Sequence, residues 1–217
     1  MLPWAEIDHA LLDMDGTLLD RHFDDHFWEE HVPQKYAELN KITYTMARKK
    51  LLAMYKKEEK TLNWTDLHYW SNRLGLDIIA MKEGMRSQLQ VHPGVEAFLH
   101  FLRDEKKEVV LVTNAHPRTV QIKLEQTLLL PYFHTVLCSA DVGLPKEEVG
   151  FWRGAKRVLQ FKKNRSLLID DNENVLMAAH TYGIRHLLHK SGANSRFLHE
   201  RSDIFPSLDH FIDIIPQ

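Results

Sequence analysis

Five short apolar runs, separated by amphipathic segments, constrain the possible fold more than any other feature of this sequence. The runs lie at residues 9–13, 108–113, 134–139, 166–170 and 184–188. Helical periodicity occupies residues 94–104, 117–128, 148–159 and 172–183, and a last short helix is expected at 207–215. Strands that alternate with helices form a parallel sheet that is covered on both faces. The sequence therefore predicts an α/β fold built on a three-layer, doubly wound parallel sheet.

The alternation is interrupted once, after the first apolar run. Residues 20–90 contain no convincing strand, but apolar residues such as Leu51 and Tyr55 recur there at helical spacing. A helical segment of this length is an insertion into the sheet rather than one of its crossover connections. We therefore expect a core made of residues 1–19 and 91–217, with a separate helical domain at 20–90.

Composition excludes several classes of protein. Apolar residues make up 44% of the 217 residues, and the net charge of −2 provides no basic face for a nucleic acid. No apolar stretch approaches the length of a membrane span, and the first residues do not resemble a signal peptide. The single cysteine, Cys138, cannot form a disulfide framework and favours a reducing compartment. These features predict a cytoplasmic protein that binds neither nucleic acid nor membranes.

Two aspartates end the first apolar run, in the stretch LLDMDGTLLD. Asp13 and Asp15 stand two residues apart, and Gly16 follows them as the chain turns. Carboxylates held this close repel each other unless a cation or a shared proton relieves the repulsion. Ligands bind at the carboxyl ends of the strands in open α/β sheets. The pair therefore predicts a functional site at this edge.

Three later segments reach the same edge of the predicted sheet. The second run ends in Thr113 and Asn114, whose hydroxyl and amide suit phosphate oxygens, and Lys146 precedes a later helix. The fourth run ends in Asp170 and Asp171. With the strand order 3-2-1-4-5, the first and fourth strands are neighbours, and all four aspartates surround one point. Oxygen ligands of this kind suit Mg²⁺.

Other motifs that gather acids or phosphates are absent. An EF-hand loop counted from Asp13 needs glycine at its sixth position, where this chain has Leu18. The chain also lacks the phosphate-binding GxxxxGK[ST] loop, the GxGxxG fingerprint, the GxSxG elbow and the HExxH helix. The site therefore has to be interpreted from the aspartates and their partners.

The ordered set DMDGTLL, VTN, PK and IDD resembles the four motifs of the haloacid dehalogenase (HAD) superfamily of phosphatases. The insertion is similar to the helical cap of the family's first subclass, and TLNW, HYW, LGLDI and TNAHP resemble its bacterial GMP/IMP 5′-nucleotidase branch. This resemblance implies an HAD-like core with a helical cap after the first strand. It also implies a Mg²⁺-dependent phosphomonoesterase that hydrolyses purine nucleoside 5′-monophosphates.

The resemblance implies a role for each aspartate. Asp13 would attack phosphorus and carry the phosphoryl group. Asp15 would protonate the leaving oxygen and then deprotonate the attacking water. The metal ligands would be Asp13, Asp15 through its carbonyl oxygen, Asp170 and Asp171, with Asp171 favoured as the direct ligand of the last two.

The remaining site residues would bind the substrate. Thr113, Asn114 and Lys146 would hold the phosphoryl group, with Thr113 and Lys146 also counted as catalytic, and His116 would line the entrance. An aromatic face beside amide donors suits a purine ring. The residues expected to contact the nucleoside are Asn63, Trp64, Tyr69 and Arg73.

Two other interpretations remain open from the sequence. A phosphatase of small sugar phosphates or phosphoglycolate, or a sugar phosphomutase, would have the same core and different cap contacts. A non-catalytic phospho-aspartyl switch of the receiver type also clusters acids, a threonine and a lysine at strand ends, but it lacks a helical insertion after the first strand. We expect the protein to be a monomer or a weak homodimer.

Overall fold

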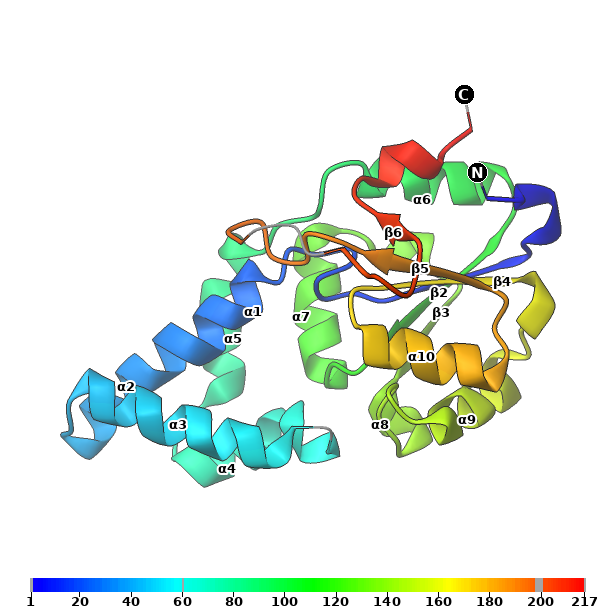
Figure 1. The fold of residues 1–217 in the computed structure, drawn as a ribbon. Helices are drawn as coiled ribbons and strands as arrows, with labels where there is room; N and C mark the ends of the chain where they lie inside the picture. Colours follow the sequence, from blue (N-terminus) through cyan, green and yellow to red (C-terminus); the bar gives the residue numbers. More distant parts are fainter. Residues whose placement is uncertain (1, 60, 198–200, 217) are drawn as a thin grey trace.

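Six parallel strands form one sheet in the order β3-β2-β1-β4-β5-β6 (Figure 1). This computed structural model describes residues 2–59, 61–197 and 201–216. The strands are β1 (His9–Leu12), β2 (Glu108–Thr113), β3 (Thr135–Cys138), β4 (Ser166–Asp170), β5 (His186–Lys190) and β6 (Ser207–Leu208). The predicted order 3-2-1-4-5 is confirmed, and β6 adds a sixth strand beside β5.

Helices cover both faces of the sheet, because alternate residues of each strand point to opposite sides. Ala10 and Leu12 of β1 pack in the cluster that contains the apolar sides of α6 (Val95–Asp104) and α7 (Pro117–Thr127). Leu11 packs in a second cluster. The helices of that second cluster are α9 (Val149–Leu159) and α10 (Glu173–Tyr182), preceded by the short α8 (Ser139–Val142). The three-layer arrangement predicted from the sequence is therefore present.

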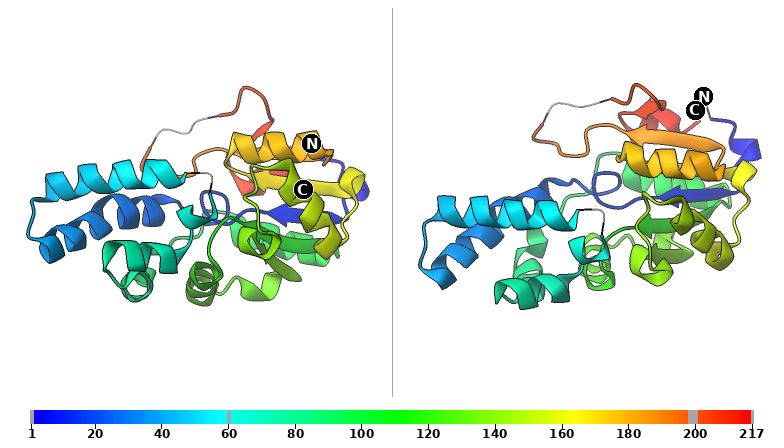
Figure 2. Two further views of the ribbon diagram at one scale, coloured as in Figure 1. Left: turned by 90° about the horizontal axis from the view of Figure 1, so that it is seen from below. Right: turned by 60° about the horizontal axis from the view of Figure 1, so that its bottom comes forward.

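The segment after β1 folds into helices that lie beside the core, next to the carboxyl ends of the strands (Figure 2). These helices are α1 (His22–His26), α2 (Val32–Asn40), α3 (Tyr44–Glu58), α4 (Leu67–Leu74) and α5 (Ile78–Met85). A π-helical turn joins α1 to α2, and short 3₁₀ turns lie at Leu62–Trp64 and Arg86–Gln88. Their apolar sides pack into a hydrophobic cluster of their own. We propose to treat these helices as a cap domain, and we call them the cap below.

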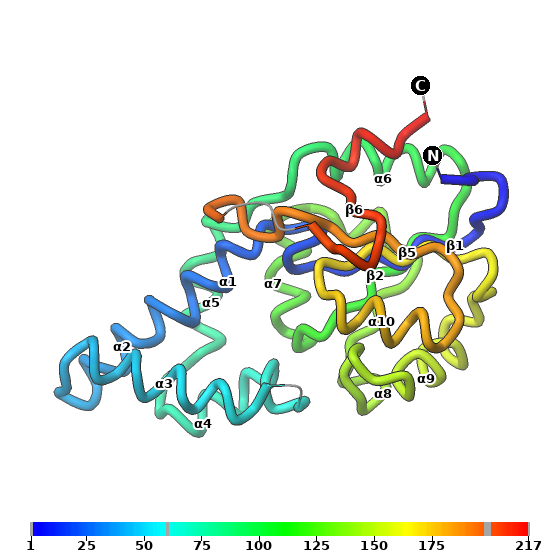
Figure 3. The backbone as a smooth tube through the Cα atoms, in the orientation of Figure 1, coloured from blue at the N-terminus to red at the C-terminus, as the bar shows by residue number. Residues whose placement is uncertain are grey.

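Two adjacent segments connect the cap to the core. Asp20 N donates to the carbonyl of Gln90 at 2.9 Å, and His92 N donates to the carbonyl of Leu18 at 2.9 Å. Leu19 and Val91 pair as an antiparallel bridge between these contacts. The chain therefore enters and leaves the cap at one place. The two termini lie near each other beside α6, at the end of the core away from the cap (Figure 3).

The structure differs from the sequence prediction near the C-terminus. The helix expected at 207–215 is replaced by β6 and a 3₁₀ turn at Phe211–Ile214. Ser207 pairs with His189 and Leu208 with Lys190, so backbone bonding to the open edge of β5 prevails over local helical periodicity. β5 also begins at His186, two residues later than expected. Within the described ranges, no helix combines the length and apolar character needed to cross a bilayer.

Candidate active site

The turn after β1 places two aspartates at the carboxyl edge of the sheet. Asp13 N donates to the carbonyl of Ile169 at 3.0 Å, which fixes this residue beside β4. Gly16 has φ of +87°, and a Cβ atom at this position would overlap the Asp171 carboxylate. Only glycine combines this backbone conformation with such a close approach. The DMDGT stretch thus forms a tight loop against the end of β4.

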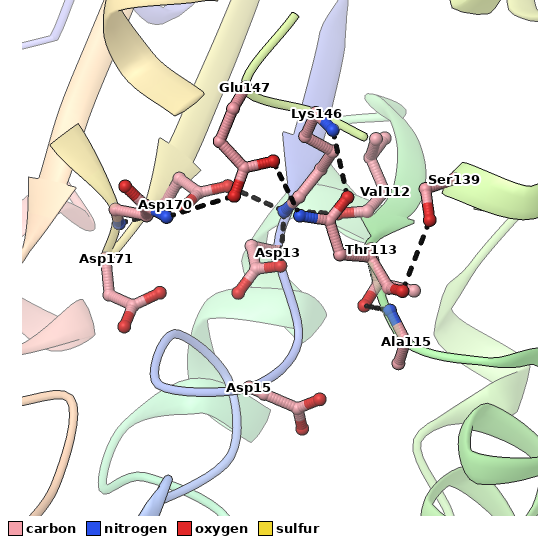
Figure 4. A network of polar contacts seen from close by, with 12 residues as sticks. Asp13, Asp15, Val112, Thr113, Ala115, Ser139, Lys146, Glu147, Asp170 and Asp171 are labelled. Carbon is pink, nitrogen blue, oxygen red and sulfur yellow. Dashed lines mark hydrogen bonds and ion pairs between the residues drawn. The ribbon is translucent and has the colours of Figure 1, made fainter. Parts of the chain in front are cut away.

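Lys146 links two of the predicted site acids (Figure 4). Its Nζ donates to Asp13 Oδ1 at 2.5 Å, to Asp170 Oδ2 at 2.7 Å and to the carbonyl of Val112 at 3.1 Å. The residue is only 2% exposed. Burial disfavours its charge, but the carboxylates of Asp13 and Asp170 outweigh burial and raise the pKa of Lys146 above its usual value. The lysine therefore stays charged at the centre of the site.

Three carboxylates form a cluster beside Lys146. Oxygens of Asp13, Asp170 and Asp171 all lie within 4.8 Å of one another. Burial and the neighbouring negative charges raise the pKa of Asp13 to about 7, that of Asp170 to about 6 and that of Asp171 to about 7. One lysine and the half-exposed Arg21, which contacts Asp171, do not neutralise three acids of which Asp13 and Asp170 are buried. The cluster thus has the donor atoms and the excess negative charge that a divalent cation requires.

Asp15 points to a different place from the other three acids (Figure 4). Its Oδ1 accepts from Lys123 Nζ of α7 at 2.5 Å. The side chain is 25% exposed and lines the cleft. The site therefore has one carboxylate, Asp13, held in the acid cluster and a second, Asp15, held outside it.

The two residues of the second predicted motif, Thr113 and Asn114, have different roles in the structure. Thr113 is buried, and its Oγ1 accepts from Ala115 N at 3.0 Å, so its own proton remains available to a ligand. Asn114 instead uses its amide within the site: its Oδ1 accepts from Lys146 N and its Nδ2 donates to Glu147, both at 2.9 Å. Asn114 thus holds the loop that carries Lys146.

A cleft of about 990 Å³ joins this edge of the core to the cap. The predicted site residues that line it are Asp13, Asp15, Trp64, Thr113, Asn114, His116, Lys146, Asp170 and Asp171. On the cap side, Trp28 and Tyr55 form an aromatic wall with Trp64. A cavity of this size holds a molecule as large as a nucleotide.

Three residues predicted to contact the nucleoside lie outside the lining of this cleft. Asn63 Nδ2 donates to Glu58 at 3.1 Å, and the Tyr69 hydroxyl donates to Glu58 at 2.7 Å. These two hydrogen bonds are the main reason that the pKa of Glu58 is lowered, and the positive charge of Arg73 lowers it further. Sequence spacing placed these side chains near Trp64 but did not fix the direction in which the helix presents them. They do not enter the substrate contacts proposed below.

Comparison with known proteins identifies the family. The family model of haloacid dehalogenase-like hydrolases matches residues 7–183. The chain belongs to this family. It is 37% identical over 215 residues to the GMP/IMP nucleotidase YrfG of Escherichia coli (strain K12), a match that covers 99% of this chain and 97% of the relative. The receiver-type switch considered above is therefore excluded, since this is a hydrolase family.

Solved structures support the same fold. A HAD phosphatase from Thermococcus onnurineus superposes with a TM-score of 0.82 at 21% identity, covering 96% of each chain. The HAD-hydrolase YfnB of Bacillus subtilis, a structure bound to magnesium, superposes with a TM-score of 0.65 at 17% identity, again over 96% of each chain. At these identities the likeness establishes the HAD fold.

Some residues of this HAD site were not predicted from the sequence. Lys123 and Lys82 are 1% and 2% exposed, and they take part in a polar network with Asp24 and Asp15. The sequence could have indicated these two lysines through their positions on apolar helix faces, since Lys123 follows Val120 by three residues and Lys82 follows Ile78 by four. A lysine is almost never fully buried unless it is paired.

Proposed function

We propose that this hydrolase is a Mg²⁺-dependent phosphomonoesterase that converts purine nucleoside 5′-monophosphates, GMP and IMP in particular, to nucleoside and phosphate. The observation that supports it most is the juxtaposition of Asp13, Lys146 and two further acids at the floor of a nucleotide-sized cleft. The named activity of the relative that is 37% identical over almost the whole chain supports the choice of substrate.

In this proposal Asp13 is the nucleophile. One carboxylate oxygen of Asp13 attacks phosphorus as the bond from phosphorus to the ribose oxygen breaks. Asp15 gives a proton to the departing ribose oxygen. Asp15 then takes a proton from water as the water oxygen attacks the phosphoryl group, which releases phosphate and restores Asp13. Two displacements let one carboxylate act as nucleophile and another as proton carrier.

The acid cluster fits a magnesium ion. Asp13, Asp170 and Asp171 would hold it with the carbonyl oxygen of Asp15, a set of oxygen donors that suits this cation. Both oxygens of Asp170 accept hydrogen bonds, from Lys146 Nζ and Asn172 N, whereas the Asp171 carboxylate is bonded to Arg21 through Oδ2. Asp171 is therefore the better direct ligand. When bound, the ion would offset the negative charge of the phosphoryl oxygens.

The substrate would lie across the cleft. Lys146 and the Thr113 hydroxyl would hold the phosphoryl oxygens, and His116 would line the path to the cap. The aromatic wall of Trp28, Tyr55 and Trp64 would receive the purine ring, since aromatic rings stack on bases of any kind. Trp64 is 38% exposed, which leaves its ring available for such stacking. The cytoplasmic location and the monomeric or weakly dimeric state stay predictions.

A panel of phosphate esters tests this function. We expect phosphate release with Mg²⁺ to be faster from GMP and IMP than from AMP, pyrimidine nucleotides, sugar phosphates and phosphoglycolate, and chelation to abolish it. Faster turnover of sugar phosphates or phosphoglycolate would favour the alternative substrates instead. Asp13→Asn should lower kcat by about 10⁴-fold or more, as loss of a nucleophile does in other enzymes. The exposed Asp104 provides the matched control, and Asp104→Asn should retain full activity.

A further inference from the structure

Lys123 occupies an unusual position for a lysine. Its side chain is 1% exposed, and its Nζ lies 2.5 Å from Asp15 Oδ1 and 2.5 Å from Asp24 Oδ2. It comes from α7 of the core, outside the four sequence motifs, whereas Asp24 comes from α1 of the cap. A single buried ammonium group therefore joins the proposed proton carrier to the cap.

The network continues one step further into the cap. The second oxygen of Asp24 accepts from Lys82 Nζ at 2.8 Å. Lys82 is buried in α5, with its Nζ 4.5 Å from the centre of the Phe27 ring. Charges thus alternate along the series Lys82, Asp24, Lys123 and Asp15, and the two lysines balance the two aspartates.

The contact with Lys123 distinguishes the two oxygens of Asp15. An ammonium group only donates hydrogen bonds, so the oxygen that it contacts, Oδ1, has to act as an acceptor. When Asp15 is protonated, its proton is therefore directed to Oδ2. Because Asp15 lines the cleft, Oδ2 is the oxygen left to exchange that proton with a leaving group or with water.

We propose that Lys123 is a positioning residue for Asp15, which fixes the orientation of this carboxyl group and connects it to the cap through Asp24. The inference rests on the proposed function, since it concerns proton transfer from Asp15 to the leaving oxygen. As the bond from phosphorus to that oxygen breaks, the proton on Oδ2 moves to it and Asp15 becomes a carboxylate paired with Lys123.

A purely structural role for Lys123 makes a different prediction. Loss of a structural contact lowers the rates of all substrates by the same factor, because it changes only the amount of folded protein. Loss of positioning selectively slows substrates whose leaving group needs a proton. The chain offers a matched control: Arg118 also lies on α7 and also joins it to a cap helix, through Glu83 of α5, without touching Asp15.

The test measures release of the leaving group in single turnovers, with enzyme in excess and Mg²⁺ present. The substrates are GMP, phenyl phosphate and p-nitrophenyl phosphate, in decreasing order of need for a proton. We expect Lys123→Met to slow GMP by about 10²-fold or more, the usual contribution of general acid catalysis, and p-nitrophenyl phosphate by less than about 10-fold. Arg118→Met should affect the three substrates equally.

Folding of the variant is checked by thermal melting. Asp24 keeps Lys82 as its partner in Lys123→Met, and Asp15 faces the cleft, so the fold should survive. Lys123→Gln provides a second variant, and the same steeper dependence on the leaving group is expected. Equal slowing of all three substrates in both variants would overturn the inference alone. Absence of monoester hydrolysis by the unchanged protein would overturn the proposed function together with it.

Discussion

Arg21 and Asp171 are separated by 150 positions in the sequence, yet Arg21 Nη1 donates to Asp171 Oδ2 at 3.0 Å. Arg21 immediately precedes α1, where the chain enters the cap, and Asp171 follows β4. A basic side chain from the connection to the cap thus contacts one of the three clustered acids. Any cation bound by these acids shares Asp171 with this arginine.

Removal of Arg21 should therefore strengthen magnesium binding. The arginine side chain is 47% exposed, so its pair with Asp171 is screened by solvent. We expect Arg21→Gln to lower the Mg²⁺ dissociation constant by about 1.5–5-fold, the range that corresponds to an exposed ion pair. Calorimetric titration with Mg²⁺ measures this change. Unchanged or weaker Mg²⁺ binding in Arg21→Gln would mean that Asp171 does not hold the ion.

Substitution of Gly16 should damage the site, whereas substitution of Gly84 should not. Gly16→Ala places a Cβ on the Asp171 carboxylate at a φ of +87°, which costs about 1–2 kcal/mol from backbone strain alone. Gly84 lies in α5, where a Cβ atom would meet no neighbouring atom within 4 Å, so Gly84→Ala should stabilise the protein by about 0.5–1 kcal/mol. Urea unfolding gives both values. Phosphatase activity should fall only in Gly16→Ala.

The three clustered acids should make the metal-free protein less stable as pH rises. Burial and like charge raise the pKa of Asp13 and Asp171 to about 7 and that of Asp170 to about 6, from the ordinary value of 3.8 that holds in the unfolded chain. The folded state therefore binds protons more tightly than the unfolded state. The stabilisation is complete below about pH 4 and is lost by about pH 7.

Melting temperatures between about pH 4 and about pH 8, with chelator present, measure this loss, and the dependence should be weaker in Asp171→Asn. Asp104→Asn, at an exposed position, should keep the slope of the unchanged protein. Excess Mg²⁺ should raise the melting temperature more at the upper end of the range than at the lower, because protons and the cation compete for the same carboxylates. An identical slope in Asp171→Asn and the unchanged protein would contradict the assigned shift.

The aromatic wall of the cleft can be tested through Trp64. Trp64→Ala should raise KM for GMP and IMP by about 5–150-fold, the range that corresponds to the loss of about 1–3 kcal/mol of base stacking. The KM of p-nitrophenyl phosphate, which has no base, should change far less. Tyr69→Phe is the matched control, since its hydroxyl contacts Glu58 outside the cleft lining. A similar rise in KM for GMP in Tyr69→Phe would restore that residue to the substrate contacts.

The sequence predicted the five longer strands because each is a short apolar run, and three of them, β1, β2 and β4, end at recognisable polar motifs. β6 escaped prediction because Ser207 and Leu208 form no apolar run, and only pairing with β5 makes them a strand. Local periodicity over 207–215 could not reveal that neighbour. The order of the five other strands was taken from the expected doubly wound fold, not from any local pattern, and the structure confirms it.

The motifs indicated the acids and the lysine at the centre of the candidate site. They did not indicate the contacts that link this centre to the cap. Lys123 contacts acids that lie 108 and 99 positions away in the chain. Such pairings depend on how α7 packs against α1, which no local pattern encodes. The cap residues Asn63 and Tyr69 lie outside the cleft lining, which the sequence could not indicate for a related reason: aromatic and amide composition indicates a binding surface without giving the direction of each side chain.

The paired connection at Leu19 and Val91 has a consequence for how such proteins diversify. Because the chain leaves the core and returns to it at neighbouring positions, everything between those positions can be exchanged without altering the register of the sheet. We expect a cap transplanted from another relative at this junction, with Asp24 and Lys82 retained, to change the preferred leaving group while the chemistry on phosphorus persists. Recognition can thus vary with the cap, while the contact between Asp24 and Lys123 is the part of the cap that catalysis constrains.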